Sequence, residues 1–280
     1  MGRILFAALW TWLHLLQICV SNQSLNPGED VLNKPWRPIP SGIVSVHNAR
    51  ILRWILLPLC LYLSMSLEAL WQGISLAISF IVYNELHLDS HWLMRNACNA
   101  WGYASFNAGA SAIAGAYYLF TPFTPYSLMT VRPALGQSTM TSRTLISFAV
   151  NALIIISTIH AQDFRDEVGD KLMGRRSIPI VWPEESRVSM LVLLPTWSVG
   201  LSWACDLAIP FSVPFCCLSL YTGLRFIQKR TADADRRSFL YYNVRFLLMY
   251  VMLEETTKLF PLLQIWLVAA QVVHIQVLYQ

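Results

Sequence analysis

Charged side chains are scarce in this sequence. Asp, Glu, Lys and Arg make up 13% of its 280 residues, about half the share found in soluble domains. Because 55% of the residues are hydrophobic, too few solvating groups remain to cover a water-facing surface. This composition excludes most nucleic-acid-binding modules, secreted disulfide scaffolds and disordered chains. It predicts an integral membrane protein that contacts the lipid bilayer and has no nucleic-acid partner.

Several chemical motifs are also absent. The six cysteines show no Cys-x-x-Cys spacing and lie inside apolar runs, which is typical of small buried apolar residues and not of a zinc site or a disulfide framework. No glycine-rich phosphate loop, Ser-His-Asp arrangement or haem motif occurs. The chemistry must therefore come from the polar residues that interrupt the apolar runs.

Long apolar runs recur along the chain. A bilayer core of about 30 Å needs about 20 apolar helical residues to cross it. Glu68 interrupts the run from Ile51 to Tyr83, which predicts a tight helical hairpin near residues 66–68, and Pro58 should kink its helix without ending it. The predicted spans are 3–20, 46–66, 69–84, 92–118, 140–161, 187–204, 207–227 and 238–253, with 259–279 as a ninth span or a helix on the membrane face. We therefore predict an all-α fold, a polytopic membrane helical bundle of eight or nine transmembrane helices in one domain over residues 1–280.

The same spans predict which connecting segments share one side of the membrane. The segments on one side are 21–45, 85–91, 162–186 and 228–237, and with their margins they carry most of the Lys and Arg residues. The long segment on the opposite side, 119–139, carries only Arg132. The positive-inside rule then assigns the basic side to the cytosol. We expect a multi-pass protein whose site opens to the cytosol, in the endoplasmic reticulum or another internal membrane.

The N-terminal run has a second interpretation. Arg3, an apolar run and then Ser21 resemble a secretory signal peptide. The run, however, contains His14 and two tryptophans, and it lacks an A-x-A-like cleavage site. We therefore favour a retained first helix.

Two of the same-side segments concentrate polar residues at helical spacing. In the later segment, Asp163, Asp166 and Asp170 stand at i, i+3 and i+7, which places three carboxylates along one face of a helix. Carboxylates stacked in this way repel one another. A divalent cation bridged to phosphate removes the repulsion, and Mg²⁺ typically binds through one or two carboxylates together with substrate phosphates.

The earlier segment repeats the pattern with less charge. Asn22, Asn26 and Asp30 stand at i, i+4 and i+8, again on one face if the helix continues. Pro27 and Gly28 interrupt it, so Asp30 is alternatively presented from a turn. Such clusters also occur as ordinary solvated loops with local ion pairs. That interpretation loses weight here, because two triads lie on the same side and each precedes Lys or Arg.

At these residues the sequence resembles the UbiA superfamily of intramembrane prenyltransferases. The signatures of that superfamily are NDxxDxxxD followed by KPxRP, and DxxDxxxD followed by GR. Here the first signature reads Asn22-Gln23, Asn26 and Asp30, then Lys34-Pro35-Trp36-Arg37-Pro38. The second reads Asp163, Asp166 and Asp170, then Gly174-Arg175. Helix number and segment sidedness extend the resemblance over nearly the whole chain.

The resemblance implies a helical bundle, normally of nine spans, around a lateral cavity for an isoprenoid tail. The two acidic motifs would face each other at the cytosolic mouth and hold Mg²⁺ and the diphosphate of an isoprenyl diphosphate substrate. The sequence departs from the family at Gln23 and Asn26, which leave the first motif less negative. Only 21 residues precede Asn22, so we expect that the family's first helix is missing here or that the sequence starts late.

One branch of the superfamily resembles this sequence in finer detail. The NQ variant of the first motif and the NKPWRPIPSG run after it are similar to a fungal branch that includes membrane-bound terpene cyclases. Residues 84–91, followed by Arg95-Asn96, Asn99 and Tyr103, are also similar to that branch. Its members ionise a prenyl diphosphate and quench the cation within the same molecule.

The resemblance also implies roles for single residues. Neutralisation of the leaving diphosphate through Mg²⁺ is assigned to the catalytic residues Asp30, Asp163, Asp166 and Asp170. The expected Mg²⁺ ligands are Asn22, Asn26, Asp30, Asp163, Asp166 and Asp170. The residues expected to pair with the outer phosphate oxygens are Lys34, Arg37, Lys171 and Arg175. The candidates for shielding the carbocation through cation–π contacts are Trp101, Tyr103, Phe106 and Tyr117, although membrane-interface positions or helix packing explain most single rings. The candidates for a supporting role beside the site, against a plain solvated turn, are Asn84 and Asp89.

Three functions remain open. The first is a terpene cyclase that ionises farnesyl or geranylgeranyl diphosphate with Mg²⁺ as cofactor. The second is a prenyltransferase that moves the isoprenyl group onto a small aromatic or other acceptor. The third is a non-enzymatic ion-binding membrane protein, which the absence of paired discontinuous helices or matching repeats disfavours. We favour cyclisation slightly over transfer.

Overall fold

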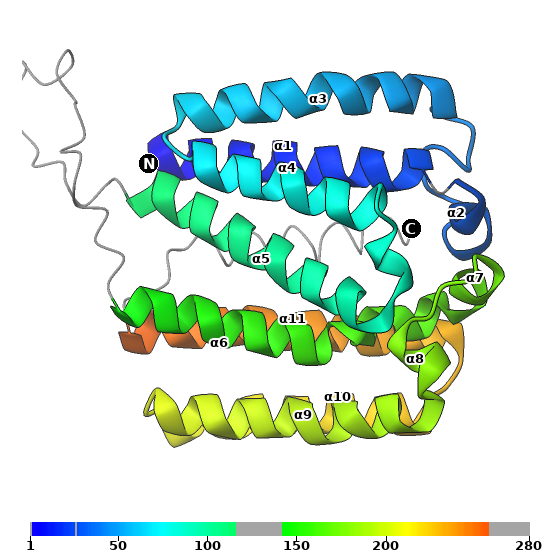
Figure 1. Cartoon of the computed structure of the whole chain (residues 1–280). Helices are drawn as coiled ribbons and strands as arrows, with labels where there is room; N and C mark the ends of the chain where they lie inside the picture. The colour runs from blue at the N-terminus through cyan, green and yellow to red at the C-terminus, as the bar shows by residue number, and fades with distance from the viewer. Residues whose placement is uncertain (1, 26, 116–141, 258–280) are drawn as a thin grey trace, which may run out of the picture.

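Long helices make up most of the structure, a computed structural model that describes residues 2–25, 27–115 and 142–257 (Figure 1). No strand occurs in these ranges. The long helices are α1 (Gly2–Leu25), α3 (Val46–Ser66), α4 (Leu70–Asn84), α5 (Trp92–Gly115), α6 (Ser142–Thr158), α9 (Pro183–Ala204), α10 (Ile209–Gln228) and α11 (Ala232–Thr257). The short elements are α2 (Pro27–Asn33), η1 (Leu88–Ser90), η3 (Ile159–Asp166), α7 (Glu167–Leu172) and α8 (Ile178–Val181).

Each long helix corresponds to one of the first eight predicted spans. The all-α prediction is therefore confirmed for the described part of the chain. By length and apolar composition, three of the described helices are able to cross a membrane, α1, α3 and α10, and α4 is a shorter apolar helix. The total of eight or nine spans stays a prediction. The ninth run, 259–279, and the segment 119–139 lie outside the described residues.

The hairpin between α3 and α4 shows how local sequence sets the helix ends. Ser45 caps α3, because its hydroxyl oxygen accepts a hydrogen bond from the backbone N–H of Asn48 at 3.1 Å. The helix continues through Pro58 and ends at Ser66. Glu68 then adopts a left-handed backbone conformation with φ of 60°, and α4 begins two residues later. The predicted hairpin is confirmed at this position.

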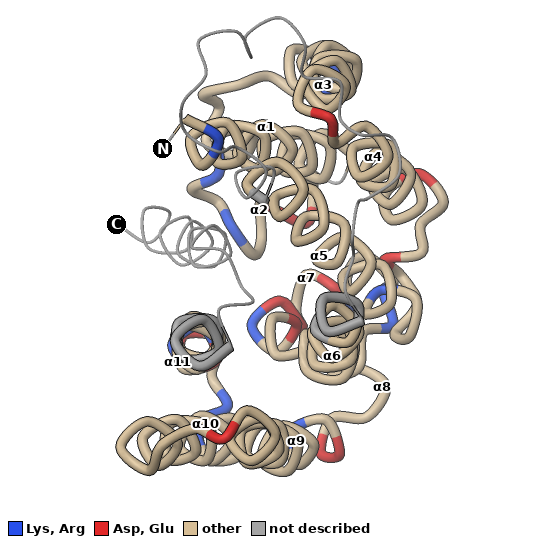
Figure 2. Tube along the Cα trace, turned by 90° about the vertical axis from the view of Figure 1, so that its left-hand side faces the viewer, with Lys and Arg blue, Asp and Glu red and all other residues tan. Residues whose placement is uncertain are grey.

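Two hydrophobic clusters hold the long helices together. One lies between α1, α4 and α5 and includes Trp10, Leu76 and Ile113. The other lies among α6, η3, α9, α10 and α11 and includes Met190 and Phe226. In the end-on view of Figure 2, α1, α3, α4 and α5 lie above α6 and α11, with α9 and α10 below. Because α5 contributes to both clusters, it joins the two halves of the bundle.

A buried arginine joins the three C-terminal long helices. Arg245 of α11 is 0% exposed, and its Nε donates to the hydroxyl oxygens of Ser198 in α9 at 3.1 Å and Ser219 in α10 at 2.7 Å. Its Nη2 donates to the backbone carbonyl oxygen of Leu194 at 3.2 Å. Since lipid tails are as apolar as leucine, polar contacts of this kind help to fix which helices pack together in a membrane.

The short elements gather at one end of the bundle, on the right in Figure 1. Contacts join the segments that the sequence places on one membrane side. The backbone N–H of Arg176, after α7, donates to the carbonyl oxygen of Ser90 in η1 at 2.9 Å. Arg236 at the start of α11 donates to the carbonyl oxygen of Asn33 in α2 at 3.2 Å. Lys34, just after α2, also donates to Asp166 of η3 at 2.9 Å, so both acidic segments meet at this end of the bundle.

Candidate functional site

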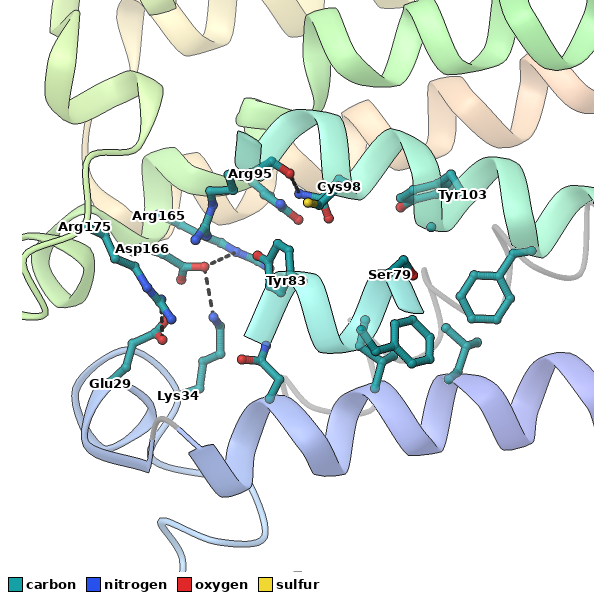
Figure 3. Close-up of a pocket in the computed structure, with 18 of the residues that line it drawn as sticks. Glu29, Lys34, Ser79, Tyr83, Arg95, Cys98, Tyr103, Arg165, Asp166 and Arg175 are labelled. Atoms are coloured by element: carbon teal, nitrogen blue, oxygen red, sulfur yellow. Dashed lines mark hydrogen bonds and ion pairs between the residues drawn. The ribbon is translucent and has the colours of Figure 1, made fainter. Parts of the chain in front are cut away.

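A cavity of about 260 Å³ lies between the acidic segments and the long helices (Figure 3). One end is polar and the other is apolar and aromatic. The polar end is lined by Glu29, Lys34, Arg37, Arg95, Arg165, Asp166 and Arg175. The apolar part is lined by Leu15, Ile18, Phe80, Tyr103 and Phe106. A ligand with an anionic head and a hydrocarbon tail matches this division.

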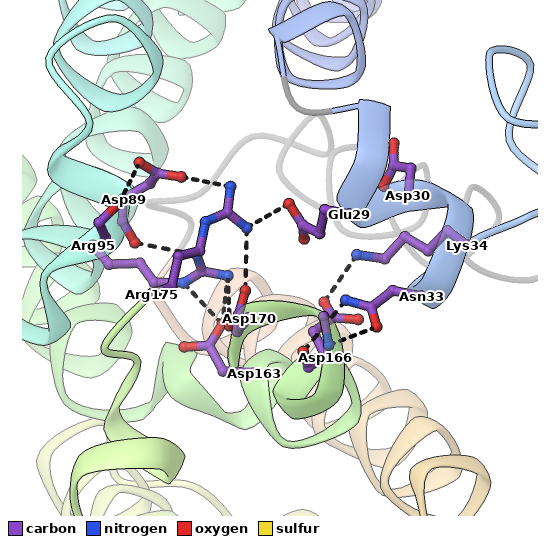
Figure 4. A network of polar contacts seen from close by, with 12 residues as sticks. Glu29, Asp30, Asn33, Lys34, Asp89, Arg95, Asp163, Asp166, Asp170 and Arg175 are labelled. Atoms are coloured by element: carbon purple, nitrogen blue, oxygen red, sulfur yellow. Dashed lines mark hydrogen bonds and ion pairs between the residues drawn. The ribbon is translucent and has the colours of Figure 1, made fainter. Parts of the chain in front are cut away.

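The first acidic segment runs from the end of α1 into α2. The described part of α1 extends to Leu25 and α2 is described from Pro27, with residue 26 between them outside the described residues. Figure 4 shows Glu29 of α2 pointing toward Arg175, with Asp30 on the other side of the same helix. The carboxylate of Asp30 instead accepts hydrogen bonds from Arg37 Nη1, at 2.8 Å and 3.0 Å to its two oxygens.

The second acidic segment continues from α6 as a 3₁₀ helix, η3, followed by α7. A 3₁₀ helix has three residues per turn, so Asp163 and Asp166 lie on one face. Both are buried, as is Asp170 in α7. From α5, Arg95 Nε donates to Asp163 Oδ1 at 3.0 Å, and from the first segment Lys34 Nζ donates to Asp166 Oδ2 at 2.9 Å. Basic side chains from two other elements thus neutralise these carboxylates.

Arg175 stands where three elements meet. The chain reverses after α7 at Gly174, whose φ of 70° favours glycine. The guanidinium of Arg175 then contacts Glu29 of α2, Asp89 of η1 at 2.7 Å and Asp170 of α7 at 3.1 Å. One buried cation therefore holds three carboxylates from separate segments (Figure 4).

Asn33 clamps the two acidic segments through uncharged bonds. Its side-chain Nδ2 donates to the backbone carbonyl oxygen of Asp166 at 3.3 Å, and its Oδ1 accepts from the backbone N–H of Gly169 at 3.2 Å. A Cβ atom on Gly169 would lie 2.2 Å from Asn33 Nδ2. An alanine at position 169 would therefore displace the Asn33 amide from these two hydrogen bonds.

Burial and neighbouring charges separate the acidities of two carboxyl groups. Burial raises the pKa of Asp163 to about 6, because its effect outweighs the opposing charge of Arg95. Burial acts in the same direction on Asp166, but the positive charges of Lys34 and Arg165 outweigh it and lower the pKa to about 2. Additional positive charge in the site would therefore stabilise the ionised form of Asp163 more than that of Asp166.

Two carboxylate oxygens fit a bound cation. Oδ2 of Asp163 and Oδ2 of Asp170 are buried and make no hydrogen bond, although buried polar atoms normally have a partner. Oxygen ligands of this type suit Mg²⁺. Within the described ranges no three His, Cys, Asp or Glu side chains form a ready metal site, because Arg95 and Arg175 lie between the carboxylates. Cation binding therefore requires an arginine to change partner.

The structure brings some of the other predicted site residues to the cavity. Asn22 and Arg37 line it at the polar end, and Tyr103 and Phe106 line its apolar part. Asp89 faces the same cluster through Arg175. Two further predicted residues, Asn26 and Tyr117, lie outside the described residues.

Other predicted site residues lie elsewhere. Lys171 has a side chain that is 58% exposed, and it pairs with Glu167 on the surface at 3.3 Å. Trp101 is partly exposed, and its Nε1 donates to Ser75 Oγ at 2.8 Å. Asn84 is buried and donates to the backbone carbonyl oxygen of the residue four positions earlier at 3.0 Å. Lys171 and Trp101 thus have partners at the surface, whereas Oδ1 of Asn84 is buried without a hydrogen bond, so a supporting role for Asn84 stays a prediction.

Sequence reasoning did not assign site roles to Glu29, Asn33 and Arg95. A signal existed for Arg95, because it is a charge inside a predicted span, where charges usually serve a function. Glu29 and Asn33 gave no comparable signal, because the direction of their side chains depends on how α2 packs against α7 and Arg175.

Most of the chain, residues 2–250, matches the UbiA prenyltransferase family. The chain belongs to this family. Family members act on isoprenyl diphosphates in membranes, and this UbiA chain is an integral membrane protein. The membership predicted from the two acidic segments is therefore confirmed.

The relatives of this UbiA chain include a bergamotene synthase, a diterpene cyclase and a polyprenyl transferase. The fumagillin beta-trans-bergamotene synthase of Aspergillus fumigatus is 27% identical over 69% of this chain and 60% of that protein, so this chain spans less than two thirds of its length. The diterpene cyclase eriG of Hericium erinaceus is 27% identical over 88% of this chain and 74% of that protein. The polyprenyl transferase eriF of the same organism is 26% identical over 88% of this chain and 78% of that protein. The predicted similarity to a fungal branch with terpene cyclases is thus confirmed.

A solved structure shares the fold of this UbiA chain. That structure is of a digeranylgeranylglyceryl phosphate synthase in membranes, and it superposes with a TM-score of 0.54 at 20% identity. The superposition covers 90% of this chain and 87% of the other. The helical bundle described above is therefore a UbiA-like fold.

Proposed function

We propose that this chain is a Mg²⁺-dependent membrane enzyme that ionises farnesyl or geranylgeranyl diphosphate and cyclises the resulting cation to a terpene. The observation that carries the proposal is the divided cavity. Its polar end combines buried carboxylates with Lys34, Arg95 and Arg175, and its other end is apolar and aromatic. Ionisation of a prenyl diphosphate needs both environments within one molecule's length.

The polar end suits a departing diphosphate. Asp163 and Asp170 would hold Mg²⁺ through their Oδ2 atoms, which accept no hydrogen bond, with Asp166 beside them and the first segment completing the set. Bound there, the cation would neutralise the charge that develops on the leaving group. Lys34 and Arg175 now pair with carboxylates. Both line the cavity, so phosphate oxygens are able to replace the carboxylates as their partners.

The apolar part suits a carbocation. Tyr103 and Phe106 line it together with Phe80. A desolvated cation over an aromatic face gains about 2 kcal/mol or more, and the apolar walls exclude the water that would quench it. This environment supports cyclisation before release.

Product analysis without an acceptor separates the three functions. Membranes that contain the full chain are incubated with Mg²⁺ and farnesyl or geranylgeranyl diphosphate, and the organic extract is analysed by gas chromatography and mass spectrometry. A terpene hydrocarbon supports cyclisation. Turnover that begins only when an aromatic acceptor is added supports the prenyltransferase alternative, which the similarity to a polyprenyl transferase keeps open. Absence of diphosphate release under both conditions supports a non-enzymatic ion-binding protein.

Matched Asp→Asn variants test the site. Asp163→Asn and Asp166→Asn should each abolish diphosphate release while the amount of protein in the membrane stays unchanged. Asp206→Asn is the control, because Asp206 is exposed between α9 and α10 and its φ of 50° is one that asparagine tolerates. Full turnover by either site variant contradicts the assignment.

A further inference from the structure

Adjacent acidic residues in α2 face different partners. Glu29 and Asp30 are 6% and 3% exposed, so both are buried acids. Successive residues of a helix point about 100° apart, and Figure 4 shows Glu29 directed toward Arg175 and Asp30 directed away from it. Glu29 therefore reaches the arginine that also contacts Asp170 of the second acidic segment, whereas Asp30 pairs with Arg37.

Asp30 is fully engaged with one arginine. Both of its carboxylate oxygens accept from Arg37 Nη1, at 2.8 Å and 3.0 Å. Arg37 lines the cavity, so the position of its guanidinium depends on Asp30. This arrangement makes Asp30 a positioning residue for a cation that faces the ligand.

Glu29 shares a single nitrogen atom with the second acidic segment. Arg175 Nη1 donates to Glu29 Oε2 and also, at 3.1 Å, to Asp170 Oδ1. The two carboxylates therefore lie on either side of one point of positive charge. Oδ2 of Asp170 and Oδ2 of Asp163 are buried beside it without a hydrogen bond. A divalent cation at this point would meet Glu29 and Asp170 together.

We propose that Glu29, and not Asp30, supplies the carboxylate of the first segment to the divalent-cation site, and that Asp30 acts on the diphosphate through Arg37. Arg175 occupies the position of the cation in the absence of metal and turns to the phosphate oxygens when metal binds. The inference rests on the proposed function, because it places cation and diphosphate in the same cavity.

Metal binding by matched neighbours tests the proposal. The full chain is purified in detergent, and Mn²⁺ binding is measured from the electron paramagnetic resonance signal of free Mn²⁺, without substrate. Glu29→Gln should raise the Kd for Mn²⁺ by about tenfold or more, since loss of even an outer-shell partner costs that much. Asp30→Asn and Asp206→Asn should each change it less than about twofold. A tenfold loss in Asp30→Asn with none in Glu29→Gln overturns the assignment.

A variant that binds Mn²⁺ more tightly than the parent excludes misfolding as the cause of the change. Arg175→Ala removes the competing guanidinium, so it should tighten Mn²⁺ binding by about tenfold, the factor that corresponds to one displaced charge-assisted bond. Weaker Mn²⁺ binding in Arg175→Ala contradicts the proposal.

Calorimetry with inorganic diphosphate tests the second role. With saturating Mn²⁺, Asp30→Asn and Arg37→Gln should each weaken diphosphate binding by about fivefold or more, and the double variant should bind no worse than Arg37→Gln alone. Additive losses contradict a role through Arg37. If Glu29→Gln loses Mn²⁺ but the parent chain makes no terpene, only the proposed function fails. If terpene forms and Glu29→Gln binds Mn²⁺ normally, only this inference fails.

Discussion

Removal of the Asn33 side chain should separate the two acidic segments. Asn33→Ala deletes the hydrogen bonds to the carbonyl oxygen of Asp166 at 3.3 Å and from the N–H of Gly169 at 3.2 Å. Each buried group left without a partner costs about 1–3 kcal/mol, so both losses together weaken the docking of α2 on α7 by at least about 2 kcal/mol. That free energy corresponds to about 30-fold. Because the proposed site needs both segments, kcat/KM for diphosphate release should fall by about this factor.

A substitution at Gly169 of α7 disrupts the same contact with Asn33. In Gly169→Ala, the new Cβ would lie 2.2 Å from Asn33 Nδ2 and 2.6 Å from its Cγ, closer than such atoms approach, so the amide must leave its position. We therefore expect a similar loss of kcat/KM. In the double variant Asn33→Ala with Gly169→Ala, the clash disappears along with the amide. The double variant should be no slower than Asn33→Ala alone.

Steady-state release of diphosphate from isoprenyl diphosphate, measured for the four chains, completes the cycle. Gly200→Ala is the control, because no atom lies within 4 Å of a Cβ built at that position, and it should retain full activity. The clamp by Asn33 would be refuted if the losses of kcat/KM add in the double variant. It would also be refuted if kcat/KM of Asn33→Ala stays within twofold of the parent value. Equal protein in the membrane and equal elution on gel filtration exclude a general folding defect.

Three further outcomes follow from packing and from the cavity walls. Gly223→Ala should lower the unfolding temperature in detergent, because its Cβ would lie 2.7 Å from the backbone Cα of Leu191 and overpacking costs about 1–3 kcal/mol; an unchanged temperature contradicts this. Arg245→Met should be more stable than Arg245→Ala, since the two serines that the arginine contacts already hydrogen-bond each other at 2.5 Å and methionine fills the space that alanine would leave empty; equal unfolding temperatures contradict this. Phe106→Ala should change the product distribution seen by gas chromatography, because Phe106 lines the cavity, whereas Trp101→Ala should leave it unchanged. The reverse pattern would contradict the assignment of the carbocation to this cavity.

The arrangement of long helices was predictable because a bilayer leaves few alternatives. Backbone polar groups in lipid must be satisfied within the segment, so each long apolar run forms a helix. Glu68 correctly predicted the turn between α3 and α4, because a charged residue is favoured at the end of an apolar run and not inside it. The acidic triad of residues 163, 166 and 170 was also visible, because its spacing is a local property of the chain.

The partners of those acids were not predictable from spacing. Arg95 and Asp163 are 68 residues apart in sequence, and only the packing of α5 against η3 brings them together. The first segment was harder still, because its spacing left open whether Asp30 is presented from a continuing helix or from a turn. Asp30 lies in α2, and the direction of that helix, which its contacts with α7 fix, decides where Glu29 and Asp30 point.

Two sets of buried ion pairs in the described part of the chain differ in how completely their atoms are engaged, and the difference indicates which set exchanges partners. Arg187 and Asp235 form a two-pronged pair with both distances at 3.0 Å, and neither residue lines the cavity described here. A buried pair with both carboxylate oxygens engaged is costly to break, so it fixes α9 against α11. Arg175 instead lines the cavity and divides its donors among three carboxylates, and Asp170 keeps one oxygen without a hydrogen bond. A set of contacts that leaves acceptor capacity unused is the kind that a cation and a diphosphate are able to rearrange at low cost.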